Sequence, residues 1–493
     1  MKTFAINTLG CKVNQYESQQ IRELLEQQGL RRAQSPQEPD LVVIHTCCVT
    51  HTASAKSRQC IRKVLRQNPD SVVLVSGCLP TAQTGELSGF DENVHLVSNR
   101  SDLAATLRHW AESETATPVC QSAQSCPNIT IKAKNGHKIK YKNEFRSESR
   151  LPTLTSFNEQ TRAFLKVQDG CDGYCSYCIV PKTRPDVHSK RIETALIEAQ
   201  ALVNSGHKEI VVTGVFLGAY GRESVRRNSW PDRRNDNLAD LLDKMTQIPN
   251  LARIRLSSLE PADVTERLLD TFCKHRNIMP HLHLPLQSGS DAMLRRMRRQ
   301  YRVGEFRKKI ESIKTRLHKP AITTDIIAGF PGETDADFEQ TLDLAKSVGF
   351  AKMHVFTFSA RRGTPAAKMQ ATFEKTVATR RSRILRDLDG ELGRQFRQQF
   401  IGETAEVLIE NDNGSDIARE AMTTGRSERY FKVYMRKAEQ KALENNDIVK
   451  VKLTENYRDG LVGIPLQRHG PVGFEDVSRA PLRGCSGHSN GVK

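Results

Sequence analysis

The sequence has no long apolar run. Stretches such as Val72 to Val75 fall far short of the roughly 20 residues that span a bilayer. The residues from Met1 to Ile6 lead directly into a strand pattern and contain no apolar core of a secretory signal. We therefore expect a soluble, cytoplasmic protein with no membrane partner.

Acidic residues are scarce relative to basic ones. The 493 residues include 74 Lys and Arg against 57 Asp and Glu, which gives a formal net charge of +17. This surplus favours a polyanionic partner, with nucleic acid the first candidate and an acidic membrane surface the second. A disulfide framework is not expected, because the chain is long and has no secretory start. The 12 cysteines are better explained as metal ligands and buried thiols.

Three cysteines, Cys171, Cys175 and Cys178, are clustered directly after the apolar run Ala163 to Val167 with the spacing C-x3-C-x2-C. Three neighbouring thiolates can ligate three irons of a cubane iron–sulfur cluster, which leaves the fourth iron open to a small molecule. The alternative is a structural zinc site. Such sites have four protein ligands, usually in two separated pairs, and no second pair follows downstream.

Residues 1–112 are predicted to form an α/β domain, because short β-rich runs alternate with helical ones as in a parallel sheet. The predicted strands cover residues 3–7, 40–45, 71–76 and 94–97, and the predicted helices cover residues 15–28 and 53–66.

A cysteine follows each of the first three predicted strands: Cys11, Cys47 and Cys78. Since the carboxyl ends of strands in an open α/β sheet converge, we expect these thiols to meet and to form a second three-thiolate cluster site. Cys48 remains an alternative ligand to Cys47, and any one of these cysteines could instead be a buried core thiol. Cys60 falls inside a predicted helix and is interpreted as packing.

The sequence resembles the radical S-adenosylmethionine (SAM) methylthiotransferases over nearly the whole chain, to about residue 465. The segments that carry the resemblance are residues 8–18, 46–50, 76–78 and 162–171, and the cysteine triple with Tyr177. Within the family, Gly10-Cys11-Lys12-Val13-Asn14-Gln15 is most similar to the branch that modifies N6-threonylcarbamoyladenosine in tRNA. Two features depart from the family: His45 replaces a usual asparagine, and residues 183–191 keep Arg184 but lack the usual arginine-glycine step.

The resemblance implies two [4Fe-4S] clusters and SAM as cofactors. The cluster on Cys171, Cys175 and Cys178 would cleave SAM to a 5′-deoxyadenosyl radical that removes hydrogen from C2 of the adenosine beside the anticodon. A second SAM would methylate sulfur at the other cluster before transfer to C2. The implied partners are tRNA and an electron donor such as flavodoxin or ferredoxin. The alternatives are methylthiolation of N6-isopentenyladenosine or of a ribosomal protein, and a non-catalytic iron–sulfur regulator that binds RNA.

Residues 161–399 are predicted to form a partial (βα)6 barrel with its active site at the carboxyl ends of the strands. The predicted strands cover residues 163–168, 209–213, 253–257, 281–286, 323–328 and 352–358. By resemblance, Gly214 lies near the amino group of SAM and Glu260 and Gln287 near its ribose, with Tyr177 as a further cofactor contact. The alternative for each is ordinary βα-turn chemistry.

The remaining segments complete an α/β chain of three domains, the first of them flavodoxin-like. Residues 113–160 are interpreted as a linker or basic insertion in which Cys120 and Cys126 are free thiols. Residues 400–466 are predicted to form a small β-barrel, similar to the RNA-binding TRAM domain of the family. Residues 467–493 are predicted to be a disordered tail.

The basic run 294–302 within the partial barrel is either a solvated helix face or a phosphate contact.

Overall fold

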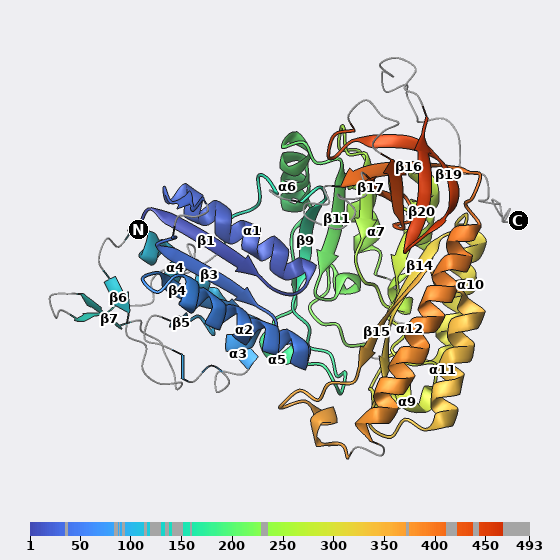
Figure 1. Ribbon diagram of the computed structural model, residues 1–493, viewed down its shortest axis with the longest axis horizontal. Coiled ribbons are helices and arrows are strands. Elements are labelled where there is room, and N and C mark those ends of the chain that lie inside the picture. Colours follow the sequence, from blue (N-terminus) through green and yellow to red (C-terminus); the bar gives the residue numbers. More distant parts are fainter. Residues whose placement is uncertain are drawn as a thin grey trace, which may run out of the picture. The chain divides into compact units, whose positions relative to one another are not determined.

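The chain forms two compact units in a computed structural model (Figure 1). The residues that the structure describes are 1–34, 38–82, 87, 89–90, 94–112, 116–118, 130–133, 138–140, 151–157, 160–227, 235–370, 374–410, 422–436 and 443–466. Unit 1 comprises residues 1–158, 177–185 and 359–364, and unit 2 comprises residues 159–176, 186–358 and 365–493.

Unit 1 is built on a five-stranded parallel sheet with the order β2-β1-β3-β4-β5. Its strands are β1 (Thr3–Thr8), β2 (Arg31–Arg32), β3 (Leu41–Thr46), β4 (Val72–Gly77) and β5 (Val94–Leu96). Its helices are α1 (Lys12–Gln27), α2 (His51–Gln67), α3 (Cys78–Ala82), α4 (Leu103–Glu112) and α5 (Val180–Thr183), with the 3-10 turn η2 (Arg100–Asp102). This strand order is that of flavodoxin-like folds, so the predicted class of the first domain is confirmed.

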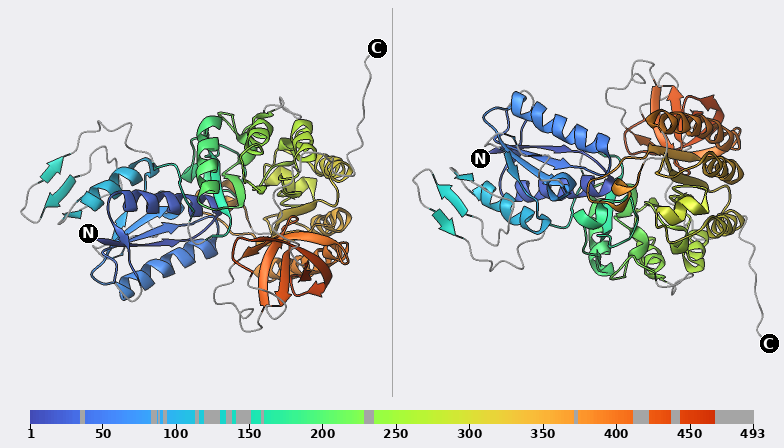
Figure 2. Two further views of the ribbon diagram at one scale, coloured as in Figure 1. Left: turned by 90° about the horizontal axis from the view of Figure 1, so that it is seen from above. Right: turned by 90° about the horizontal axis from the view of Figure 1, so that it is seen from below.

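Helices cover both faces of this sheet (Figure 2). Leu41 and Val43 of β3 belong to a core with residues of α1 and α4. Val42 and Ile44 belong to a second core with residues of α2 and α3. Since alternate side chains of a strand point to opposite faces, residues 41–44 of β3 are apolar on both faces, as expected for a central parallel strand.

Three short strands follow α4: β6 (Ala116–Pro118), β7 (Thr130–Ala133) and β8 (Lys138–Lys140). They form an antiparallel sheet inside residues 113–160, the segment interpreted from the sequence as a linker or basic insertion. Cys120, Cys126 and the predicted tail 467–493 lie outside the described residues.

Unit 2 contains the six parallel strands expected of a partial (βα)6 barrel. They are β9 (Ala163–Asp169), β11 (Glu209–Gly214), β12 (Arg253–Leu256), β13 (His281–His283), β14 (Ala321–Ala328) and β15 (Lys352–Thr357). β9, β11 and β12 pair in one sheet and β13, β14 and β15 in another, and parallel bridges Ile254 to Ile278 and Ser258 to His283 join the two. The short β10 (His188–Ser189) pairs antiparallel with β9.

Helices follow the strands of the partial barrel. They are α6 (Ile192–Asn204), α7 (Asn237–Met245), α8 (Glu266–Lys274), α9 (Asp291–Arg296), α10 (Val303–Arg316), α11 (Asp335–Val348) and α12 (Lys375–Gln398), with the 3-10 turns η3 (Leu217–Ala219), η4 (Pro261–Asp263) and η5 (Pro365–Lys368). None of the helices that the structure describes has the length and apolar character required to cross a bilayer.

The C-terminal part of unit 2 is a closed five-stranded barrel, which confirms the predicted small β-barrel. Its strands are β16 (Thr404–Glu410), β17 (Met422–Ser427), β18 (Lys432–Arg436), β19 (Ile448–Tyr457) and β20 (Gly460–Pro465). Buried arginines of β12 join the two barrels. Arg253 donates to the carbonyl oxygen of Glu406 at 2.8 Å, and Arg255 donates to that of Glu428 at 3.0 Å.

Candidate functional site

Three cysteines of unit 1, Cys11, Cys47 and Cys78, lie at the carboxyl edge of its sheet. Cys11 precedes α1 as its N-cap, Cys47 directly follows β3, and Cys78 is the first residue of α3. Gly10 has φ +109°, and a Cβ atom there would come within 2.7 Å of the Cβ of Cys47. A glycine is therefore required for this turn to pass so close to Cys47.

The three thiols influence one another electrostatically. Burial, together with the nearby thiols of Cys78 and Cys11, raises the pKa of Cys47 to about 11, against the lowering effects of the Val49 backbone N–H and Arg184. Burial also raises the pKa of Cys11. A bound cation would relieve this repulsion, because metal ligation deprotonates thiols whose own pKa is high.

Cys48 has different surroundings from Cys47. Its side chain is fully buried in the apolar core beneath α2, and its thiol donates to the carbonyl oxygen of Cys78 at 3.2 Å. These contacts are those of a packed core thiol. The geometry therefore favours Cys47 over Cys48 as the companion of Cys11 and Cys78.

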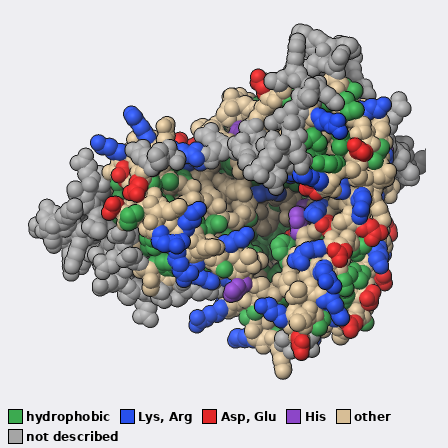
Figure 3. Space-filling view, in the orientation of Figure 1, with side chains coloured by type: hydrophobic (Ala, Val, Ile, Leu, Met, Phe, Trp, Pro, Cys, Tyr) green, Lys and Arg blue, Asp and Glu red, His purple; other side chains and the backbone are tan. Residues whose placement is uncertain are grey.

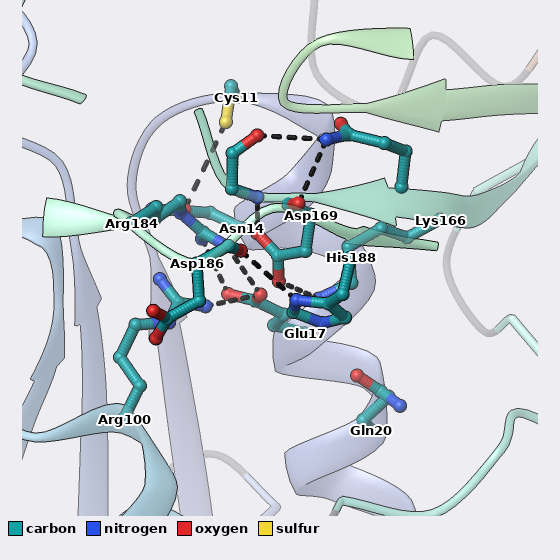
Figure 4. Close-up of polar contacts among 12 residues, drawn as sticks. Cys11, Asn14, Glu17, Gln20, Arg100, Lys166, Asp169, Arg184, Asp186 and His188 are labelled. Carbon is teal, nitrogen blue, oxygen red and sulfur yellow. Dashed lines mark hydrogen bonds and ion pairs between the residues drawn. The ribbon is translucent and has the colours of Figure 1, made fainter. Parts of the chain in front are cut away.

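A buried polar network supports the turn that carries Cys11 (Figure 4). Asn14 donates to the carbonyl oxygens of Leu9 and Thr46, at 2.8 and 2.9 Å, and its Oδ1 lies 4.0 Å from the Sγ of Cys11. Arg184 lies 3.4 Å from the same Oδ1. The amide thus fixes the two strand ends on either side of the turn.

Glu17 is the centre of this network. Arg184 donates to its two carboxylate oxygens at 2.9 and 2.8 Å, His45 Nε2 lies 3.1 Å from it, and Arg100 also forms an ion pair with it. Two guanidinium groups against one carboxylate leave a net positive charge beside the thiols, and Arg184 lowers the pKa of both Cys11 and Cys47. The sequence pointed to Arg184 and His45 but gave no signal for Arg100 or for the role of Glu17.

The second set of cysteines occupies the loop after β9. Cys171 and Cys175 belong to unit 2, whereas Tyr177 and Cys178 belong to the segment assigned to unit 1. Burial raises the pKa of Cys171 to about 12, and the backbone N–H of Gly173 donates to its Sγ at 3.4 Å. Ser176 anchors the loop, because its backbone N–H donates to the carbonyl oxygen of Met297 at 3.0 Å.

A buried charge cluster adjoins Cys175. Arg299 donates to the Sγ of Cys175 at 3.0 Å and also pairs with Glu260. Arg227 pairs with Asp263 and lies 3.7 Å from the Oε2 of Glu260. That Oε2 atom is buried and accepts no hydrogen bond from the described residues. One oxygen of Glu260 is therefore held by Arg299, and the other is available to a ligand with hydroxyl or amine donors.

Arg299 and Arg227 were not singled out by the sequence. Arg299 lies in the basic run 294–302, but only 8% of it is exposed, so the interpretation of a solvated helix face is wrong for this residue. The only available signal was a run of five arginines, which does not reveal which of them is buried.

The other two predicted SAM contacts lie at strand ends. Gly214 ends β11 at a register shift, and a Cβ atom there would lie 3.0 Å from both Cβ and Oε1 of Gln168. Gln287 is buried and has φ +66°, an uncommon value for a residue with a side chain. Its backbone N–H donates to the carbonyl oxygen of Asp325 in β14 at 2.8 Å.

Two family models match the chain. Residues 3–99 match a family described as "Uncharacterized protein family UPF0004", and residues 165–345 match the radical SAM superfamily. The chain is also similar in fold to the radical SAM methyltransferase TsrM from Kitasatospora setae, with a TM-score of 0.50, 12% identity and coverage of 84% of this chain and 81% of that one.

Curated relatives extend the similarity over most of the chain. The threonylcarbamoyladenosine tRNA methylthiotransferase MtaB of Bacillus subtilis is 35% identical over 92% of this chain and 94% of its own length. The Thermotoga maritima protein of the same name is 32% identical over 83% and 87%. The tRNA-2-methylthio-N(6)-dimethylallyladenosine synthase of Rhodococcus jostii is 32% identical over 86% and 81%. The chain therefore belongs to the radical SAM methylthiotransferase family.

Proposed function

We propose that this enzyme transfers a methylthio group to C2 of N6-threonylcarbamoyladenosine next to the anticodon of tRNA. The observation that carries the proposal is the presence of two separate three-cysteine sets, one at the sheet edge of unit 1 and one in the loop after β9. A methylthio transfer to an unactivated carbon needs both a hydrogen abstraction and a sulfur donor. The name of the Bacillus relative supports the nucleoside.

The residues present fit two [4Fe-4S] clusters and SAM. We assign one cluster to Cys171, Cys175 and Cys178, and the other to Cys11, Cys47 and Cys78; each set offers three thiols and so leaves an iron open. When bound, the clusters and SAM supply the electron, radical and sulfur chemistry that side chains lack. All six cysteines are free of disulfides, as ligation requires.

The side chains around Cys175 would bind and orient the cofactor. Arg299 compensates the negative charge of a thiolate at Cys175 and holds Glu260 in place. The second oxygen of Glu260 can accept from the ribose hydroxyls of SAM, and we assign Gln287 to the same ribose and Gly214 to the amino group. Tyr177 adjoins the last cysteine and completes the proposed contacts.

The C-terminal barrel is proposed to bind the tRNA. Lys450 and Lys452 of β19 are exposed and alternate with the buried Val449 and Val451, so one face of this strand presents ammonium groups to solvent. Small β-barrels with such surfaces are suited to contact the phosphate backbone. We infer that a flavodoxin or ferredoxin supplies the electron.

The test is an assay with the anaerobically reconstituted protein, SAM, a reductant and tRNA that carries threonylcarbamoyladenosine. Mass spectrometry of the digested nucleosides should reveal 2-methylthio-N6-threonylcarbamoyladenosine together with 5′-deoxyadenosine. A Cys175→Ala variant is the control and should yield neither product.

The second candidate substrate is N6-isopentenyladenosine, because the Rhodococcus synthase is nearly as similar to the chain as the Bacillus relative. The same assay with isopentenylated tRNA separates the two. Formation of 5′-deoxyadenosine without a methylthiolated nucleoside from either tRNA would contradict both substrates, and a ribosomal-protein substrate would then be tested. If a protein with both clusters yields neither product, the regulator alternative is favoured.

A further inference from the structure

Two histidines and an aspartate lie on three neighbouring strands of unit 2, apart from the cysteine sites in the sequence. His283 ends β13, Asp325 lies inside β14, and His354 lies inside β15. The parallel register pairs Asp325 with His354, and His283 with Thr323. Because residues two apart on a strand share a face, Thr323 and Asp325 point to the same side, and all three potential ligands project from one face of the sheet.

This face is the one opposite the helix layer. Thr357 of β15 contacts Ser382 of α12 with 2.8 Å between the hydroxyl oxygens, so the side chains of residues 353, 355 and 357 face the helix. The alternate residues point the other way, and both His354 and Phe356 are exposed. The three potential ligands therefore face the concave side of the partial barrel, and His354 is exposed there.

The three ligand atoms converge. Each lies within 4.8 Å of the others, and His283 Nε2 is 3.3 Å from the Oδ1 of Asp325. The ring centroids of His283 and His354 are 5.7 Å apart. Two ligands at about 2.1 Å from one metal ion can be at most about 4.2 Å apart, so a modest rotation of the exposed His354 ring is sufficient to complete the site.

The orientation of His283 is set by a neighbour. Its Nδ1 lies 2.9 Å from the hydroxyl of Thr323, the kind of contact that directs the other ring nitrogen of a metal-binding histidine toward the ion. When Nδ1 donates to Thr323, Nε2 and the carboxylate of Asp325 are two acceptors that face each other. Such a pair needs a cation or a proton between them.

No lysine or arginine of the described chain forms an ion pair with Asp325. Lys352, two residues before His354 on the same strand, pairs instead with Asp389 of α12. Histidine and carboxylate ligands without a thiol suit divalent first-row metal ions such as Mn²⁺, Fe²⁺ and Zn²⁺. A set of two histidines and one carboxylate also leaves coordination positions open to a further ligand.

We propose that His283, Asp325 and His354 form a mononuclear site for a divalent first-row transition-metal ion, separate from the iron–sulfur sites. The ion has three protein ligands, and its open positions face the concave side of the partial barrel. Thr323 is a positioning residue that holds the ring of His283.

The test uses the full-length protein with both clusters reconstituted and without RNA. Mn²⁺ is the first probe because it binds weakly to thiols, and its free concentration is followed by electron paramagnetic resonance during titration. We expect one Mn²⁺ ion to bind at this site. His354→Ala and Asp325→Asn should each weaken this binding at least about 10-fold, and Thr323→Val should weaken it about 10-fold.

His318→Ala is the matched control, because His318 is exposed and its imidazole is not part of the proposed site. Circular dichroism and cluster absorbance verify that each variant is folded and loaded. A second titration uses Zn²⁺ against a chromogenic chelator. The proposal is overturned if neither ion distinguishes the wild type from His354→Ala and Asp325→Asn, in which case a proton joins His283 and Asp325. Neither outcome depends on methylthiotransferase activity.

Discussion

At the scale of single residues, burial decides between side chains that the sequence presents as equivalent. Cys47 and Cys48 are adjacent, and the sequence alone left both as ligands. In the fold, successive residues after β3 point to opposite sides, so Cys48 enters the apolar core while Cys47 remains beside Gly10 and the other two thiols. The spacing predicted which strand ends carry the cysteines, but the orientation of each thiol depends on packing.

Replacing Cys47 should therefore have a different effect from replacing Cys48. We expect Cys47→Ala to lower the iron content of the reconstituted protein to about half and to abolish methylthiolation, while SAM cleavage continues, because one three-thiolate site is lost. The measurements are iron per chain and the yields of methylthiolated nucleoside and 5′-deoxyadenosine. Cys48→Ala is the matched control and should retain both clusters. An unchanged iron content in Cys47→Ala would exclude the assignment.

Arg299 shows what a local pattern cannot reveal. Its partners Cys175 and Glu260 are 124 and 39 positions away in the sequence, so only the folded barrel brings them together. Glu260 could be proposed from its strand end, whereas the arginine that holds it was hidden in a run of similar residues.

Arg299→Gln should impair SAM cleavage, because it removes the guanidinium beside the Cys175 thiol and leaves the buried Glu260 with only its longer ion pair to Arg227. We expect the rate of 5′-deoxyadenosine formation to fall by about 10-fold or more and the free energy of unfolding to fall by about 3 kcal/mol. Arg295→Gln, in the exposed part of the same run, is the control. Equal rates in the two variants would show that Arg299 has no part in SAM binding.

At the scale of elements, regular patterns were predicted well and glycine-rich strands were not. All six strands of the partial barrel were expected, because each is a short apolar run between helices. In the terminal barrel, β17 and β20 contain glycines inside the strand, and these weaken the strand pattern in the sequence. Gly463 of β20 is in fact required by close packing, because a Cβ atom there would lie 2.7 Å from the Cγ1 of Val433.

The contact between the two barrels of unit 2 should depend on pH through Glu209. Burial opposes ionisation of this carboxyl, but attraction to Arg255, Arg162 and Arg253 outweighs it and lowers the pKa to about 2. A lowered pKa stabilises the fold at pH values above the ordinary value of about 4.5, and this contribution is lost as the pH falls toward 2. Glu209→Gln should therefore cost about 3 kcal/mol at pH 7 and progressively less below pH 4.5.

Urea denaturation followed by circular dichroism at several pH values measures this difference. Glu193→Gln is the matched control, because Glu193 is exposed at the start of α6, and it should have little effect at any pH. A destabilisation by Glu209→Gln that does not change between pH 7 and pH 3 would contradict the lowered pKa.

At the scale of the whole molecule, one surface of unit 1 carries a group of basic side chains. Helix α2 contains five lysine and arginine residues, and three exposed ones lie in a stripe along one side of the helix: Lys56, Lys63 and Arg66. The helix contains no acidic residue, and Figure 3 shows basic side chains gathered over this part of unit 1. The composition predicted a polyanionic partner, but only the helix geometry aligns these three charges.

If α2 contacts the tRNA backbone, neutralising the stripe should weaken binding and lower its dependence on salt. Each lost phosphate contact removes a released counterion, so the triple Gln variant of Lys56, Lys63 and Arg66 should bind tRNA about 10-fold more weakly at moderate salt, with a shallower slope of log K against log salt. Binding is measured by fluorescence anisotropy at several salt concentrations.

The matched control is a triple Gln variant of Arg380, Arg383 and Arg394, which are exposed on α12, because it removes the same amount of charge from a different surface. Equal slopes for the two variants would mean that net charge alone attracts the RNA, whereas a shallower slope for the α2 variant alone would identify α2 as a contact.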